Sequence, residues 1–252
     1  MRAFFRALKN ETLIKSNTLK GKPMYFSATN LYKAWDSIKI SLSFECEQGT
    51  MTSIVGPSGS GKSTVLRIIA GLESCSSSSP AAQSKIILDG KDISRLPPAK
   101  RGIGMVFQSH SLFAHMTVED NVAYGLRCHG VPKKQSREQA RAFLSKFNLS
   151  GFGKRLPDTL SGGEAQRVSL ARTLIIKPAL VLFDEPLSAL DAPLRRRLAD
   201  EIRALQSQTG FTAIMVTHDL SEAKRISDKI LLIKNGSLTW QGTPDRFKDD
   251  LL

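Results

Sequence analysis

The chain has 252 residues and a formal net charge of +13 at pH 7. Hydrophobic residues make up 41% of it, which is typical of a globular domain, and no apolar run approaches the roughly 18 to 20 residues of a membrane-spanning helix. The three cysteines, Cys46, Cys75 and Cys128, show neither a CxxC spacing nor a metal-binding pattern, which indicates a reducing compartment.

The first 23 residues form the most basic part of the chain. They hold six Lys and Arg against the single acid Glu11, and they show neither a continuous apolar region nor a cleavage site of a secretory signal. We expect residues 1–23 to be a flexible basic extension, or not part of the native chain if translation starts at Met24. The positive charge is interpreted as a solvated surface rather than as a nucleic-acid site.

The segment from Met24 to Gln108 predicts strands around one helix. Alternating or continuous apolar runs predict strands at Met24–Leu31, Ile38–Phe44, Met51–Val55, Lys85–Leu88 and Gly104–Phe107. Ser63–Leu72 has the apolar spacing of a helix. Ser74–Ser84 contains four consecutive serines, and we expect it to be a mobile loop.

The rest of the chain alternates between helices and strands. Helices are expected at Val118–Arg127, Arg137–Phe147, Gly163–Leu174 and Arg195–Gln206, and strands at Leu180–Phe183, Thr212–Val216 and in a hairpin over Lys229–Trp240. This alternation predicts an α/β fold with a mainly parallel sheet wrapped by helices. The mostly helical block at approximately 109–165 interrupts the pattern and is a candidate subdomain.

A glycine-rich loop links the third strand to the first helix. It matches the phosphate-binding pattern G-x-x-x-x-G-K-[ST] and consists of Gly56, Pro57, Ser58, Gly59, Ser60, Gly61, Lys62, Ser63 and Thr64. Glycines let backbone N–H groups approach phosphate oxygens, and the following helix adds its dipole. We expect Lys62 to reach the β- and γ-phosphates and Ser63 to offer its hydroxyl to Mg²⁺.

Three later strands are each followed by a polar side chain. Leu180–Phe183 leads to Asp184 and Glu185, which suit an Mg²⁺-holding acid and a general base for the attacking water. His218 follows the strand Thr212–Val216 and could orient that water, and Gln108 follows another strand and could sense both Mg²⁺ and water. Parallel sheets bind ligands at the carboxyl ends of their strands, so these groups are expected to meet there.

A second glycine-rich loop, Leu160–Glu164, opens the helix that follows the block 109–160. It too looks suited to hold a phosphate, although one such loop suffices for one nucleotide. Taken with the first loop, it raises the question of which nucleotide the second loop contacts.

Together these motifs resemble, in order and almost throughout from Met24, the ATP-binding domain of ABC-type ATPases. The resemblance implies one domain over 24–252 with a P-loop NTPase (RecA-like) core, an N-terminal antiparallel β subdomain and an inserted helical subdomain. It implies ATP and Mg²⁺ as ligands and a second copy of the chain as partner. The signature residues Ser161, Gly162, Gly163 and Glu164, and Asp191 of the D-loop Ser188–Asp191, would complete the partner's ATP site.

The resemblance also implies an aromatic residue that stacks on adenine. Trp35 within Lys33-Ala34-Trp35 is our choice, with Tyr32 as the alternative. The stretch Leu96–Gln108 is similar to importer ATPases for sugars, polyamines, iron(III), sulfate and thiamine, with thiamine as a lead from Leu238–Gly242. Such ATPases attach peripherally to permease subunits at the cytoplasmic face of the inner membrane and are supplied by a solute-binding protein.

Three alternatives stay open from sequence alone. One is the ATPase of an ABC exporter, and another is an ABC protein of translation or DNA repair. The third is a P-loop kinase, against which Asp184-Glu185 argues because a kinase needs no hydrolytic water. Tandem domains or a long coiled-coil insertion, which translation and repair members carry, do not fit in 252 residues, so no nucleic-acid partner is expected.

Overall fold

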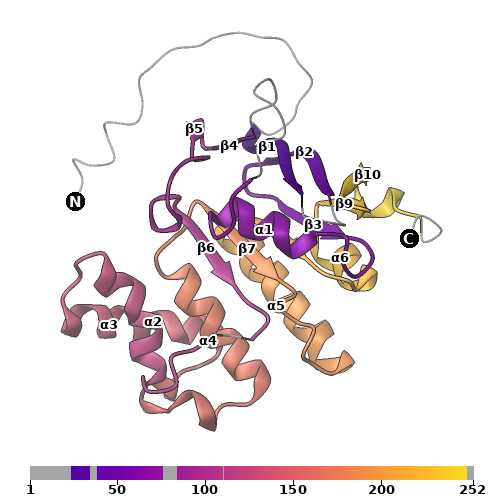
Figure 1. Ribbon diagram of the computed structural model, residues 1–252. Coiled ribbons are helices and arrows are strands. Elements are labelled where there is room, and N and C mark those ends of the chain that lie inside the picture. The colour runs from indigo at the N-terminus through magenta and orange to yellow at the C-terminus, as the bar shows by residue number, and fades with distance from the viewer. Residues whose placement is uncertain (1–23, 35–38, 76–83, 110, 249–252) are drawn as a thin grey trace.

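The computed structural model describes residues 24–34, 39–75, 84–109 and 111–248. Ten strands in this part of the chain form one sheet in the order β5-β4-β1-β2-β10-β9-β3-β8-β7-β6 (Figure 1). The strands are β1 Met24–Ala34, β2 Lys39–Glu47, β3 Met51–Val55, β4 Lys85–Leu88, β5 Lys91–Asp92, β6 Ile103–Val106, β7 Leu180–Asp184, β8 Thr212–Val216, β9 Lys229–Lys234 and β10 Ser237–Gly242. The helices are α1 Lys62–Ala70, α2 Val118–Cys128, α3 Lys133–Leu144, α4 Gly162–Leu174, α5 Ala192–Thr209 and α6 Leu220–Ile226.

The centre of the sheet is parallel. β9, β3, β8, β7 and β6 are neighbours in that order and all pair in parallel. β3, β7 and β8 are buried at every position, as strands covered on both faces must be, which explains their continuous apolar sequences. Because β8 lies between β3 and β7, the segments that follow these three strands leave the same edge of the sheet.

The remaining strands, from β5 to β10 in the order of the sheet, are mainly antiparallel. β1 pairs with β2 and β4, and β4 pairs with the two-residue strand β5, all antiparallel. The alternation in β2 is regular, with every second residue buried from Ile40 to Cys46. The predicted fold class, a mainly parallel P-loop core with antiparallel N-terminal strands, is confirmed.

Two apolar cores lie on opposite faces of the parallel strands. Alternate residues of one strand go to different cores: Val181 and Phe183 pack with the helices α2 to α5, whereas Leu180 and Leu182 pack with α1 and the antiparallel strands. The helix that follows the first glycine loop is therefore enclosed between the parallel sheet and β1, β2 and β4. This enclosure fixes the position of the loop that precedes it.

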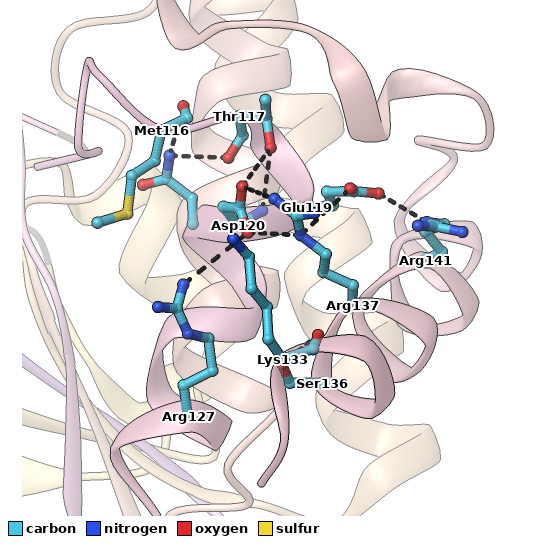
Figure 2. A network of polar contacts seen from close by, with 10 residues as sticks. Met116, Thr117, Glu119, Asp120, Arg127, Lys133, Ser136, Arg137 and Arg141 are labelled. Carbon is cyan, nitrogen blue, oxygen red and sulfur yellow. Dashed lines mark hydrogen bonds and ion pairs between the residues drawn. The ribbon is translucent and has the colours of Figure 1, made fainter.

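Helices α2 and α3 lie on one side of the molecule, away from the antiparallel strands (Figure 1). Ion pairs join the two helices: Arg137 Nε donates to Asp120 Oδ1 at 2.8 Å, and Arg141 Nε donates to Glu119 Oε2 at 2.6 Å (Figure 2). The Glu119 carboxylate is nearly buried, whereas its partner Arg141 is exposed. That this region is a separate subdomain remains a prediction.

Most predicted elements are present with shifted ends, but three differ. Arg137 does not begin its helix, because α3 already begins at Lys133, directly after the N-cap residue Pro132. The helix α6 and the short strand β5 had not been expected, since both are short and carry few apolar residues. No helix in the described residues is long and apolar enough to cross a membrane.

Candidate functional site

The first glycine loop forms a pocket between β3 and α1. Gly56, Gly59 and Gly61 have positive φ angles of 149°, 77° and 94°. A Cβ at Gly56 would lie 2.0 Å from the carbonyl oxygen of Ile233, so only glycine fits there. The resulting cavity of about 450 Å³ is lined by Ser58, Gly59, Gly61, Lys62, Ser63, Thr64 and Glu185.

The floor of this pocket is electropositive. No side chain caps the start of α1, so the N–H groups of its first turn remain available to a ligand. Lys62 is buried, and its Nζ donates to the carbonyl oxygens of Gly56 and Pro57, both at 2.9 Å. Burial lowers the pKa of Lys62, against the opposing effect of Glu185 and Asp184. A helix N-terminus beside a desolvated ammonium is a binding site for phosphate.

The hydroxyl of Ser63 contacts a carboxylate from a distant part of the chain. Ser63 Oγ donates to Asp184 Oδ1 at 2.7 Å, and Asp184, the last residue of β7, is nearly buried. Magnesium prefers such hard oxygen ligands and keeps several waters. The hydroxyl and carboxylate next to the phosphate pocket therefore fit an Mg²⁺ ion.

Glu185 adopts a backbone conformation that is uncommon for a residue with a side chain. Its φ is +47°, and its N–H donates to the carbonyl oxygen of Val216 at the end of β8. The left-handed conformation is energetically unfavourable for a residue other than glycine, and residues that adopt it are concentrated at functional sites. Glu185 lines the pocket, whereas Asp184, one residue earlier, does not.

His218 reaches the same place from the neighbouring strand. Its Nδ1 lies 3.1 Å from Glu185 Oε2, and the His218 side chain is about half exposed. The structure thus brings together Lys62, Ser63, Asp184, Glu185 and His218, as expected from the strand ends. Their catalytic and metal-binding roles remain predictions.

Other predicted site residues lie outside this pocket. Gln108 is exposed after β6 and does not line the cavity, and neither do Pro57 and Ser60 of the loop itself. Trp35 lies outside the described residues, whereas Tyr32 is half-buried in β1. The choice between the two as the adenine contact remains a prediction.

The second glycine loop is also separate from the pocket. Ser161 caps α4, accepting from the Glu164 N–H while the Glu164 carboxylate accepts from the Ser161 N–H. None of Ser161–Glu164 lines the cavity formed by Gly56–Thr64. A Cβ at Gly162 would lie 3.3 Å from a methyl carbon of Leu190, so the loop packs closely on the segment that ends at Asp191. Asp191 caps α5 by accepting from the Leu194 N–H.

Sequence reasoning missed two polar residues that surround His218. Thr217 Oγ1 donates to Glu222 Oε2 at 2.9 Å, and both residues are buried. Glu222 lies on α6, the helix that had not been expected. The available signal was Asp219, a residue type that favours helix starts and here accepts from the N–H groups of Ser221 and Glu222.

Comparisons with known proteins agree with this geometry. The sequence profile of the family described as "ABC transporter" matches residues 40–188. The chain is 47% identical over 225 residues to a Fe(3+) ions import ATP-binding protein FbpC of Rhizobium etli, covering 88% of this chain and 62% of that protein. It is 49% identical over 203 residues to FbpC 1 of Rhizobium meliloti, covering 81% and 56%. The chain therefore spans about three fifths of the length of these relatives.

Two solved structures are similar over most of the chain. One is cbiO1 from Clostridium perfringens, described as part of the ABC transporter complex cbiONQ, with a TM-score of 0.77, 26% identity and coverage of 88% of this chain and 90% of that one. The other is the ADP conformation of MJ1267, an ATP-binding cassette of an ABC transporter, with a TM-score of 0.76, 26% identity and coverage of 88% and 92%.

Proposed function

The chain belongs to the ABC transporter family, and from this premise we propose that it is the ATP-hydrolysing subunit of an importer. One observation carries the proposal: the carboxylate of Glu185 lines the same pocket as the phosphate-binding loop and contacts His218. A site that only binds nucleotide needs no carboxylate in this place. A site that hydrolyses it needs a group to accept the proton of the attacking water.

The loop would hold the polyphosphate of ATP. The N–H groups at the start of α1 would donate to phosphate oxygens, and the Lys62 ammonium would leave its two carbonyl acceptors for the stronger phosphate acceptors. Ser63 and Asp184, with Gln108, would hold Mg²⁺, which neutralises charge on the phosphates when it is bound.

Glu185 would accept a proton from a water molecule while the oxygen of that water attacks the terminal phosphorus of ATP. The bond between this phosphorus and the oxygen of the leaving ADP would break, so the products are ADP and inorganic phosphate. His218, whose Nδ1 is 3.1 Å from Glu185 Oε2, would fix the orientation of this carboxylate and of the water. The left-handed backbone of Glu185 supports this role, since the strained turn aims the side chain at the pocket.

The pocket of one chain would be completed by a second copy. Ser161, Gly162 and Gly163 lie outside the pocket of their own chain, yet they stand at the start of α4, where the helix dipole favours a phosphate. Two copies facing each other would place this loop over the partner's ATP. Asp191, which follows the residues packed on Gly162, would belong to the same interface.

The relatives suggest the cargo and the other subunits. Both curated relatives are named for import of Fe(3+) ions, so Fe(3+) is the cargo we propose, and thiamine gains no support from them. Membrane permease subunits and a solute-binding protein would be the partners, with this chain at the cytoplasmic face of the membrane. The description of cbiO1 as part of a transporter complex supports such an assembly.

The test is hydrolysis by the purified chain and its Glu185→Gln variant. We expect the chain to release phosphate from ATP in the presence of Mg²⁺ and the variant to lose at least a hundredfold in kcat while it still binds ATP, because loss of a general base costs about 10² to 10⁴. Glu138→Gln, the same change at an exposed site on α3, is the control and should keep full activity. An active Glu185→Gln variant would contradict the role of this carboxylate.

A further inference from the structure

Glu222 is a buried carboxylate beside the site, and the proposed mechanism does not use it. Only 5% of its surface is exposed, and it lines a cavity of about 260 Å³ between α5 and α6. Its Oε2 accepts from the Thr217 hydroxyl, whereas its Oε1 is buried without a hydrogen-bond partner among the described residues. A buried carboxylate with a single hydrogen bond costs stability, so its presence calls for a reason.

The partner of Glu222 holds the turn that carries His218. Besides donating to Glu222, Thr217 Oγ1 accepts from the Asp219 N–H at 3.0 Å. The Thr217 N–H donates to the carbonyl oxygen of Ile54, at the end of β3. The Thr217 hydroxyl therefore connects Thr217 and Asp219, the residues on both sides of His218. Glu222 sets the direction of that hydroxyl by accepting its hydrogen bond.

The charged groups around Glu222 do not neutralise it by contact. Arg195 of α5 pairs with Asp219 at 3.0 Å, and its second terminal nitrogen donates to the Leu190 carbonyl oxygen. Arg196 and Arg225 line the same cavity, and Arg225 pairs with Asp200. The other elements packed on α6 add little: β3 carries no titratable group, and Asp245 and Arg246 of the turn Pro244–Arg246 are exposed.

We propose that Glu222 is a positioning residue, whose carboxylate acts through Thr217 to hold His218 against Glu185. The inference rests on the proposed hydrolysis. An ionised Glu222 accepts a charge-assisted hydrogen bond from Thr217, and a neutral one accepts a weaker bond. Burial, with a smaller contribution from Asp219, raises the pKa of Glu222 to about 7, so this bond changes strength close to neutral pH.

The test compares Glu222→Gln, Thr217→Val and the double variant across pH 6 to 9. At pH 8 we expect Glu222→Gln to lower kcat about three- to tenfold, as the loss of one charge-assisted hydrogen bond allows, with an unchanged KM for ATP. The ratio of wild-type kcat to variant kcat should then approach one as the pH falls through about 7. The double variant should be no slower than Thr217→Val, because both changes break the same connection.

Asp200→Asn is the matched control, since it removes an exposed carboxylate from the same contact between α5 and α6. It should leave the pH profile unchanged. A kcat ratio between wild type and Glu222→Gln that does not vary with pH would overturn the proposal, as would additive effects of the two substitutions.

A second readout does not depend on turnover. The backbone N–H of Asp219, which donates to Thr217 Oγ1, should show in NMR spectra a chemical-shift change with a midpoint near pH 7 that disappears in Glu222→Gln. If the wild-type chain hydrolyses no ATP, the proposed function fails, while this amide signal still decides whether Glu222 acts through Thr217 on the turn that carries His218. The same pH-dependent change of the Asp219 amide in Glu222→Gln would refute the positioning role.

Discussion

Replacing Glu222 with Gln should stabilise the protein at alkaline pH. This is expected even though the change removes the charged carboxylate that accepts a hydrogen bond from Thr217. The pKa of Glu222 is raised from 4.5 to about 7, mainly by burial. Between these values the native state holds a proton that the unfolded state has released, so the free energy of unfolding decreases as the pH rises through this window and levels off above pH 7. Because one pKa unit corresponds to about 1.4 kcal/mol, the ionised carboxylate costs the native state about 3 kcal/mol at pH 8.

The assay is urea unfolding of wild type and Glu222→Gln without nucleotide, at pH 5 and pH 8. The other titrating groups are common to both proteins, so the difference between them isolates this one carboxylate. At pH 5 the ionisation of Glu222 costs the native state only about 1 kcal/mol. The free energy of unfolding of the Gln variant, relative to that of wild type, should therefore increase by about 2 kcal/mol from pH 5 to pH 8. A difference that stays constant with pH would refute the reasoning, because Glu222 would then titrate alike in both states.

Three further predictions each concern a single residue. Lys62→Met should weaken binding of a fluorescent ATP analogue at least about tenfold, since it removes the only ammonium that lines the pocket in the described residues, and unchanged binding would contradict this role. Gly236→Ala should unfold the protein or lower its Tm by more than about 6 °C, because its Cβ would lie 1.7 Å from the Lys39 carbonyl oxygen, whereas Gly130→Ala, which meets open space at a similar φ, should cost about 1 kcal/mol. Arg101→Met should lower the free energy of unfolding by about 2 to 4 kcal/mol in urea titrations, since the buried guanidinium donates to four carbonyl oxygens, those of Ile68, Ile69, Ser94 and Leu96; a loss below 1 kcal/mol would contradict it.

The central part of the site could be predicted from sequence because each short motif directly follows a strand that the sequence also predicts. The glycine loop follows β3, Asp184 ends β7 and His218 follows β8, and parallel strands direct their ends to one edge of a sheet. The motifs and their positions at strand ends therefore predicted that Ser63 and Asp184 lie close together, and the hydrogen bond between them shows that they do.

Contacts that depend on tertiary packing could not be predicted. Glu222 lies on a seven-residue helix that is too short for the spacing of Leu220, Ala223 and Ile226 to predict it, so neither the helix nor its bond to Thr217 was visible beforehand. The approach of Gly162 to Leu190 joins two motifs about thirty residues apart, and no local pattern encodes it. The left-handed backbone of Glu185 is likewise accompanied by a hydrogen bond to Val216 on another strand, which no local pattern encodes.

The most direct test of the account asks whose nucleotide the second glycine loop contacts. Glu185→Gln with ATP and Mg²⁺ should sediment as a pair of copies, and the double variant Glu185→Gln with Ser161→Arg should bind ATP with unchanged affinity but remain a single copy. That result would place Ser161 at the partner's ATP. A double variant that still pairs, or one that loses its own affinity for ATP, would contradict the account, because the loop would then be dispensable or would serve the site of its own chain.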